Sequence, residues 1–115
     1  MLAEEYEKAR VNAHKLRDIF GKNNFFLELQ DQGIDVEKRV NREMVRLSRE
    51  SGIPLVVTND CHYLTREDAR AHEVLLCIQT GKTMSDTNRM KFATAQFYFK
   101  TAAEIVLRTD GGNGD

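Results

Sequence analysis

Hydrophobic residues near the start of the chain recur at steps of three and four, with charged residues between them. They are Leu2, Tyr6, Ala9, Ala13, Leu16 and Phe20. This spacing predicts an amphipathic helix that ends at Gly21. Residues 25–30, Phe-Phe-Leu-Glu-Leu-Gln, are rich in strand formers and are followed by a turn-prone Asp-Gln-Gly. A buried strand is therefore predicted over residues 25–30.

A second apolar stripe follows Asp35, which can cap a helix. The stripe consists of Val36, Val40, Met44 and Leu47. Gly52 ends this helix and Pro54 prevents its return. Residues 54–58, Pro-Leu-Val-Val-Thr, form a short β-branched run that is typical of an inner strand covered on both faces. Because a helix separates the two strands, they are predicted to be parallel.

The second half of the chain carries two capping boxes. Residues 65–68, Thr-Arg-Glu-Asp, are a variant capping box that starts a helix ending at Gly81. Residues 82–94 are polar and irregular, which predicts a long surface loop. Residues 96–100 are predicted to form a strand, and Thr-Ala-Ala-Glu at 101–104 starts a short last helix.

The alternation of strands and helices predicts an α/β fold with parallel strands and amphipathic helices. Right-handed crossovers lead either to a doubly wound sheet or to a section of a β/α barrel. The chain has 115 residues, which suits one small domain. A closed barrel typically needs about 250 residues, so a barrel here would be a partial one.

Composition restricts the class of protein. Apolar residues make up 41% of the chain and charged residues 30%, which argues against disorder and against a membrane protein. The net charge of -1 gives no general attraction to nucleic acid phosphates. Cys61 and Cys77 form no CxxC motif, and the acidic start lacks the positive charge of a signal peptide. A reduced, cytoplasmic location without a membrane partner is expected.

The strongest chemical signal is the pair Asp60 and His62, directly after the Val-Val strand. Residues two apart in extended backbone point the same way, so both side chains can face one metal ion. Active sites of α/β folds collect at the carboxyl ends of parallel strands. The alternative is that Asn59-Asp60 is an ordinary turn or cap. A zinc or manganese site also needs three or more protein ligands, and this pair supplies two.

Other candidates carry less weight. Glu28 could point toward the same sheet edge, although a solvent-exposed carboxylate is the preferred interpretation. His72 and Cys77 are expected in the packed face of their helix, and His14 on the surface. Cys61 is expected to point away from its two neighbours, into packing. The chain has no nucleophile pair, phosphate-binding loop or dinucleotide fingerprint, so no catalytic residue is predicted.

Three stretches together resemble a known family. They are residues 25–30, Phe-Phe-Leu-Glu-Leu-Gln; residues 52–64, Gly-Ile-Pro-Leu-Val-Val-Thr-Asn-Asp-Cys-His-Tyr-Leu; and residues 71–82, Ala-His-Glu-Val-Leu-Leu-Cys-Ile-Gln-Thr-Gly-Lys. In this order they resemble the bacterial DNA polymerase III alpha family, in the later half of its PHP (polymerase and histidinol phosphatase) domain. The resemblance continues through residues 88–90 and 97–98.

The resemblance implies a partial PHP domain over residues 1–109, a fragment of a distorted β/α barrel that holds two or three metal ions. In some polymerases of this family the site is a 3′ to 5′ exonuclease, and in others the domain is a structural platform. Asp60 and His62 match the last metal-binding motif. Their implied partner is a divalent metal, zinc or manganese, or else magnesium, at a site that is incomplete here because the other ligands lie upstream.

The implied parent is a DNA-directed DNA polymerase, a nucleotidyltransferase of DNA replication, and this chain alone is expected to be inactive. The implied partners are the rest of the polymerase chain, DNA through the parent, and other replisome subunits. Two alternatives remain: a stand-alone PHP-type phosphoesterase and a non-catalytic interaction module. Gln32 departs from the His often found there, and the sequence from Val106 onward does not resemble the family. Residues 110–115 are expected to be a disordered tail.

Overall fold

The computed structural model describes residues 3–109, which fall into two compact units. The first contains the chain up to Asp31 together with Asp35–Thr58, and the second contains Gln32–Ile34 and the chain from Asn59 onward. Leu2 and the predicted tail at 110–115 lie outside the described residues.

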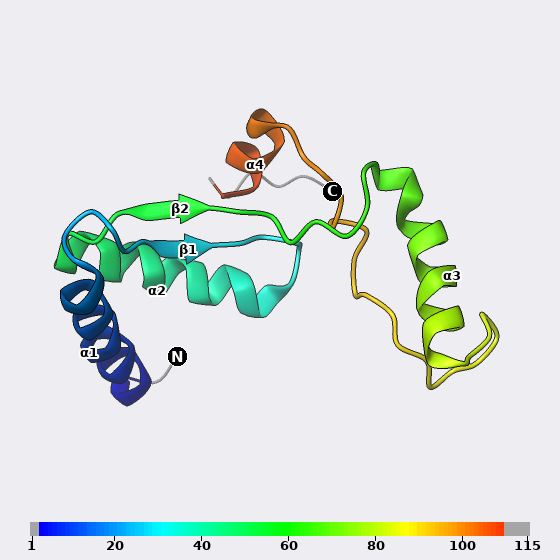
Figure 1. Cartoon of the computed structure of the whole chain (residues 1–115), viewed down its shortest axis with the longest axis horizontal. Helices are drawn as coiled ribbons and strands as arrows, with labels where there is room; N and C mark the ends of the chain where they lie inside the picture. Colours follow the sequence, from blue (N-terminus) through cyan, green and yellow to red (C-terminus); the bar gives the residue numbers. More distant parts are fainter. Residues whose placement is uncertain (1–2, 110–115) are drawn as a thin grey trace. The chain divides into compact units, whose positions relative to one another are not determined.

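The first unit contains two helices and a two-stranded parallel sheet. Its elements in chain order are α1 (Ala3–Phe20), β1 (Leu27–Leu29), α2 (Asp35–Ser51) and β2 (Leu55–Val57). β1 pairs with β2 in parallel, with Leu27 opposite Leu55 and Leu29 opposite Val57. α2 lies along one side of the two strands, as Figure 1 shows. The predicted α/β architecture with parallel strands is confirmed in this unit.

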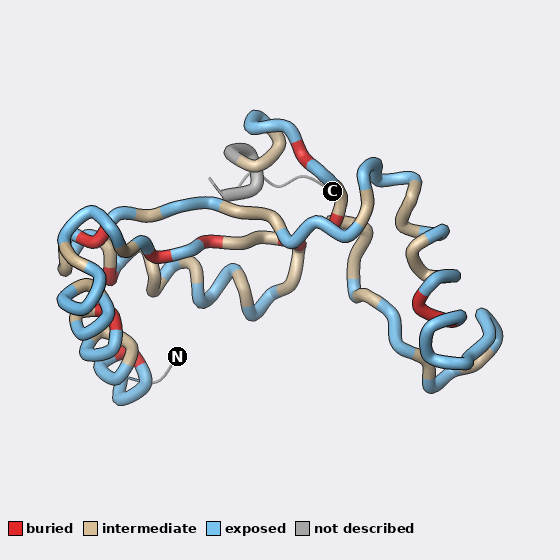
Figure 2. The backbone as a smooth tube through the Cα atoms, viewed as in Figure 1, coloured by how far each residue is buried: buried red, intermediate tan, exposed pale blue. Residues whose placement is uncertain are grey.

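The core of the first unit lies between the helices and one face of the sheet. In β1 the side chains alternate, because Leu27 and Leu29 are buried and Glu28 is exposed. Leu47 of α2 is 2% exposed and Ile53 is 1% exposed. Figure 2 shows buried positions of this unit in red along α1 and β1. The buried cluster comprises Tyr6, Ala13, Leu27, Leu47 and Ile53, with Phe25, Met44 and Leu55 packed against it.

The turn between α2 and β2 sets the position of Ile53. Gly52 has φ +72°, a left-handed conformation that glycine adopts without a steric penalty, and its N–H donates to the Ser48 carbonyl at 2.9 Å. The Ser48 hydroxyl donates to the Ile53 carbonyl at 2.6 Å. Hydrogen bonds between Ser48 and Gly52 and between Ser48 and Ile53 therefore join the end of α2 to the segment that leads into β2.

The opposite face of the sheet is uncovered by the described residues. Val56, which lies opposite the exposed Glu28, is 40% exposed, and Phe26, just before β1, is also exposed. Within residues 3–109, the prediction of an inner strand covered on both faces is not met, because α2 packs on one face only and the described sheet has two strands. The apolar residues at 54–58 predict a strand that buries its side chains. They do not show which other segments provide the layer that covers its second face.

The second unit is built around α3 (Ala69–Thr80), preceded by the short 3-10 helix η1 (Arg66–Asp68). The predicted capping box is confirmed, because the Asp68 carboxylate accepts hydrogen bonds from both the backbone N–H and the hydroxyl of Thr65. Gly81, with φ +68°, ends α3 as predicted. α4 (Ala102–Thr109) is the last helix.

The strand predicted over residues 96–100 is reduced to one bridge, in which Tyr63 pairs in parallel with Tyr98. The Phe97 carbonyl accepts from the His62 N–H at 2.7 Å, and the Phe99 N–H donates to the Tyr63 carbonyl at 3.1 Å. The prediction of a full strand was wrong, because within residues 96–100 this bridge at Tyr98 is the extent of the pairing. None of the described helices is both long and apolar enough to cross a membrane.

We expect Ile53→Val to lower the free energy of unfolding by about 0.5–1.5 kcal/mol, because it removes one methylene from a filled core. Urea denaturation followed by circular dichroism at 222 nm measures the effect. Val36→Ala is the matched control, since Val36 is 58% exposed on α2 and a surface change of this kind stays within about 0.5 kcal/mol. Equal effects of the two substitutions would contradict the placement of the core.

We expect the isolated chain to self-associate through the uncovered sheet face, because exposed apolar side chains beside open strand edges favour pairing with another copy. Phe26→Ser combined with Val56→Thr should lower the average molar mass measured by light scattering. Lys22→Ser, at an exposed position in the preceding turn, should leave the mass unchanged. A monomer at high concentration for the unmodified chain would contradict this expectation.

Candidate functional site

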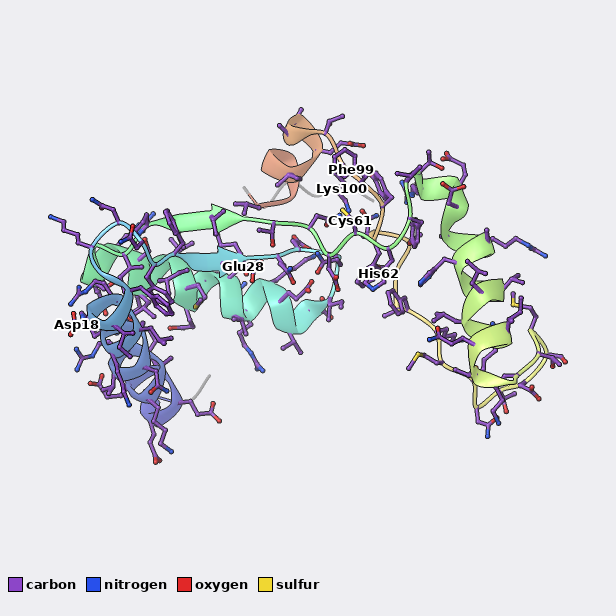
Figure 3. The ribbon with its side chains drawn as sticks, in the orientation of Figure 1. Asp18, Glu28, Cys61, His62, Phe99 and Lys100 are labelled. Carbon is purple, nitrogen blue, oxygen red and sulfur yellow. The ribbon has the colours of Figure 1, made fainter. Side chains whose placement is uncertain are left out.

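Asp60 and His62 lie in the loop that follows β2, within the second unit. Nδ1 of His62 is 3.0 Å from the main-chain oxygen of Asp60 and 3.7 Å from its carboxylate oxygen Oδ1. The His62 side chain is 34% exposed and that of Asp60 is 53% exposed. The two predicted residues are thus neighbours in space and both reach solvent. Figure 3 labels His62 together with Cys61 and Lys100.

The hydrogen bond at Nδ1 decides which ring nitrogen of His62 can bind a ligand. A main-chain carbonyl oxygen can only accept, so Nδ1 must carry the proton and donate to Asp60. In the neutral imidazole the lone pair then belongs to Nε2. Metal-binding histidines commonly use this arrangement, in which one nitrogen donates to a carbonyl and the other coordinates.

The side chains of Asp60 and His62 are brought together by a tight turn. From the sequence, an extended backbone was expected to do this. The Cys61 N–H donates to the Asn59 carbonyl at 3.0 Å, which closes the backbone over one residue. Cys61 is consequently exposed, with Sγ 3.8 Å from the Tyr98 carbonyl oxygen. The expectation that Cys61 points into packing was wrong, because the alternation on which it rested is interrupted at this turn.

Aromatic rings surround the imidazole of His62. The ring centroids of Phe92 and Phe97 lie 4.7 Å and 5.6 Å away in edge-on geometry, and that of His72 lies at 5.5 Å. Burial lowers the pKa of His72, and the nearby His62 lowers this pKa further. His72 therefore favours its neutral form and contributes to packing, in line with its predicted place in the helix face.

A buried polar group holds Asn59, directly before the pair. Its Oδ1 accepts from Gln32 Nε2 at 3.2 Å and from Lys100 Nζ at 3.2 Å, and its Nδ2 donates to the Tyr98 carbonyl at 2.6 Å. Gln32 is 1% exposed and Lys100 is 6% exposed. Sequence reasoning did not find this group, because its members are far apart in the chain.

Glu28 belongs to the first unit. Its carboxylate accepts a hydrogen bond from the hydroxyl of Thr58, and the residue is exposed. The Thr58 hydroxyl also accepts from Gln30 Nε2 at 3.1 Å. These contacts agree with the preferred interpretation of Glu28 as a carboxylate in solvent at the sheet surface.

Further ligands for a metal are not found in the part of the chain that the structure describes. No group of three or more His, Cys, Asp or Glu side chains comes together there. Asp60 and His62 fit the donor chemistry of a divalent metal but supply only two ligands. A closed site needs at least one more.

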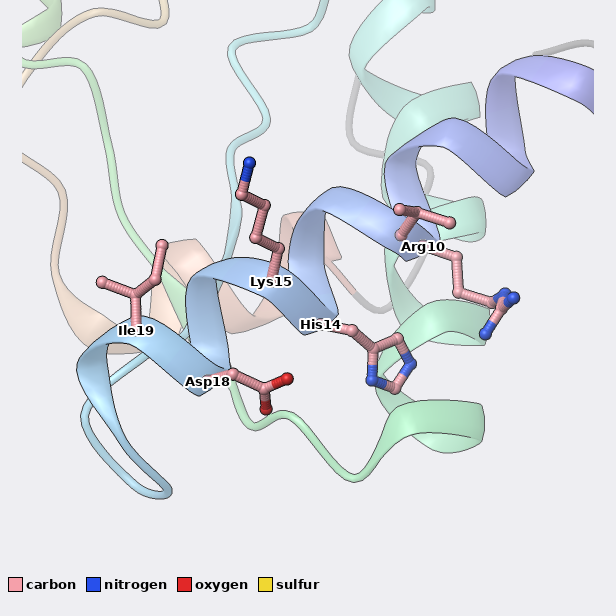
Figure 4. Close-up of a pocket in the computed structure, with 6 residues that line it drawn as sticks. Arg10, His14, Lys15, Asp18 and Ile19 are labelled. Atoms are coloured by element: carbon pink, nitrogen blue, oxygen red, sulfur yellow. The ribbon is translucent and has the colours of Figure 1, made fainter.

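An open depression lies on the surface of α1 (Figure 4). All its walls come from this one helix, and no second element contributes a side chain. It is lined by Arg10, Val11, His14, Lys15, Asp18 and Ile19. His14 is partly exposed there, close to its predicted surface position. A helix surface without converging groups is not a catalytic constellation.

α4 begins directly after Lys100 with the second predicted capping box. The Glu104 carboxylate accepts from the backbone N–H of Thr101 at 2.7 Å and from its hydroxyl at 3.0 Å. The backbone hydrogen bond lowers the pKa of Glu104 below its usual value, and the hydroxyl lowers it further. Tyr98 donates to the same carboxylate at 3.1 Å, so the cap also holds the segment that contacts the site.

We expect the α4 cap to be lost in acid. Because the pKa of Glu104 is lowered in the folded chain, its contribution is present above the unfolded pKa and disappears as the pH falls through the folded value. The amide shift of Thr101, followed by NMR during an acid titration, should report this transition. In Glu104→Gln that titration should vanish, whereas Glu67→Gln, at an exposed position before α3, should leave it unchanged.

Comparison with known proteins gives a consistent set of relatives, and no family model matches the chain. DNA polymerase III subunit alpha of Mycobacterium leprae is 49% identical over 98 residues, which covers 85% of this chain. The corresponding proteins of Treponema pallidum and Thermus aquaticus are 46% and 40% identical over 106 and 105 residues. The chain spans about 8% of the length of these relatives.

Proposed function

We propose that this chain, which is homologous to one segment of the bacterial DNA polymerase III alpha subunit, works as part of a replicative DNA polymerase. Identity of 40–52% over most of the chain supports this proposal. The parent activity is DNA-directed DNA synthesis by nucleotide transfer. The segment is a partial PHP-type domain, a portion of a β/α barrel of which β1, α2 and β2 are one repeat.

Within that domain, Asp60 and His62 hold a divalent metal ion, zinc, manganese or magnesium. The observation that carries this proposal is the hydrogen bond from His62 Nδ1 to the Asp60 carbonyl, which leaves the lone pair of the neutral ring on Nε2. The Asp60 carboxylate is near the same ring, with Oδ1 3.7 Å from Nδ1. A bound divalent ion supplies Lewis-acid activation for phosphoester hydrolysis. Asp60 contributes negative charge and an oxygen ligand, and its main chain keeps the imidazole in the tautomer that coordinates.

The remaining ligands come from the rest of the polymerase chain. The described residues provide no third ligand near the pair, so the isolated chain is expected to be inactive in hydrolysis and in polymerisation. DNA reaches the domain through the parent, and other replisome subunits are partners of the whole polymerase. The exposed Phe26 and Val56 are consistent with burial against further strands of the parent.

A non-catalytic platform is the second candidate function. The uncovered sheet face supports it, because a surface built to pack against other polymerase segments has this apolar character whether or not a metal binds. A stand-alone phosphoesterase has less support, since two ligands do not complete a metal site.

We expect weak binding of Mn²⁺ by the chain, lost in Asp60→Ala and reduced at least about tenfold in His62→Ala. Mn²⁺ broadens NMR signals of nearby nuclei, so the broadening of the Asp60 and His62 amides during a titration measures the affinity. His14→Ala is the matched control, because His14 lies on the surface of α1, in the other unit.

Broadening that persists unchanged in both variants would contradict the metal proposal and leave the platform function. The gene sequence before Met1 and after Asp115 distinguishes the hypothesis of a polymerase fragment from that of a stand-alone phosphoesterase. An upstream His-x-His motif and a downstream polymerase palm are expected.

A further inference from the structure

We infer that Gln32, Asn59 and Lys100, here called the Asn59 clamp, position the Asp60–His62 loop. Asn59 and Lys100 are then positioning residues for the site, although neither is a candidate ligand. The relevance of this inference to metal binding rests on the function proposed above. The inference itself concerns the geometry of the loop and is supported by contacts within the second unit alone.

The side-chain amide of Asn59 is held from both ends. Its oxygen receives two donors, Gln32 Nε2 and Lys100 Nζ, and its nitrogen donates to the Tyr98 carbonyl. Exchanging the amide oxygen and nitrogen would place N–H groups against two other donors and an oxygen against a carbonyl. A single orientation of Asn59 is therefore compatible with this environment, and this fixes the residue directly before Asp60.

The burial of Lys100 gives the clamp its energetic weight. An ammonium group taken out of water is strongly destabilising unless acceptors replace its hydration. Here the replacements include Asn59 Oδ1 and the Gln96 carbonyl, while the Tyr98 ring centroid lies 4.2 Å from Nζ. Moving Asn59 away would weaken the solvation of a buried charge, so the positions of Asn59 and Lys100 are coupled.

The same segment also attaches to the other end of the loop. The Phe97 carbonyl accepts from the His62 N–H, and the Phe99 N–H donates to the Tyr63 carbonyl. Asp60 and Cys61 thus lie between two attachments, the Asn59 clamp before them and the backbone bridge after them. Lys100 acts on this loop although it is 41 residues from Asn59 in sequence.

Position 32 requires a hydrogen-bond donor. Gln32 is buried, its Nε2 donates to Asn59, and its main-chain oxygen accepts from the Thr94 hydroxyl. An imidazole N–H can donate to the same oxygen, whereas leucine fills similar space without a donor. Gln32→His should therefore preserve the clamp, and Gln32→Leu should not.

The test uses the full 115-residue chain and two NMR readouts that need no metal. The first is the ¹⁵N signature of the His62 ring, which reports whether Nδ1 carries the proton. The second is the hydrogen-exchange rate of the His62 amide. In Lys100→Met and Gln32→Leu we expect a mixture of His62 tautomers and amide exchange about tenfold faster, as for the loss of one hydrogen bond. Gln32→His and the exposed control Lys82→Met should match the unmodified chain.

The amide of Leu27 separates loop positioning from general destabilisation. It donates to the Pro54 carbonyl in the first unit, and its exchange should stay the same in all four variants. Two results would overturn the inference: an unchanged His62 signature in Lys100→Met, or a change matched by equally faster exchange at Leu27. Gln32→His behaving like Gln32→Leu would overturn the role of the donor at position 32.

Adding Mn²⁺ to the same samples separates this inference from the proposed function. If the unmodified chain shows no broadening at Asp60 and His62, the metal proposal fails, and the tautomer and exchange data still decide whether the clamp exists. If broadening occurs, it should weaken in Lys100→Met and Gln32→Leu and persist in Gln32→His. Equal broadening in all these variants, together with an unchanged His62 signature, would count against the clamp.

Discussion

Two parallel strands that follow one another in a chain need a connection that returns to the same end of the sheet. In this chain α2 makes that connection and at the same time buries the Leu27 and Leu29 face of β1. Leu47 and Ile53, at the end of α2 and in the turn after it, complete the contact. β2 ends at Val57, and the loop that carries Asp60 and His62 follows it in the chain.

The candidate site combines a local element with a distant one. The turn at Asn59–Cys61 is local and brings the Asp60 carboxylate beside His62. The segment around Phe97 and Lys100 is distant in sequence and supplies the groups that hold both ends of the turn. An exposed pair of side chains is thus supported by buried contacts beneath it.

Local chemistry could be predicted well from the sequence. The helix N-termini at Thr65 and Thr101 were identified from residues within one turn of each. The carboxylates of Asp68 and Glu104 accept the expected hydrogen bonds there. The proximity of Asp60 and His62 was also predicted, although the reason differed. The strand expected over residues 96–100 is reduced to one bridge, because strand-forming residues do not reveal how far a distant segment pairs with them.

The sequence by itself determined the order of the helices and of the first two strands, the caps that start the later helices, and the proximity of Asp60 and His62, because each depends on side chains close together in the chain. Similarity to the polymerase subunits was likewise readable from residue order alone. Only the tertiary structure decided that Gln32 and Lys100 meet at Asn59, and that Val56 remains exposed. Burial and long-range hydrogen bonds depend on which distant segments pack together, and no local pattern encodes that choice.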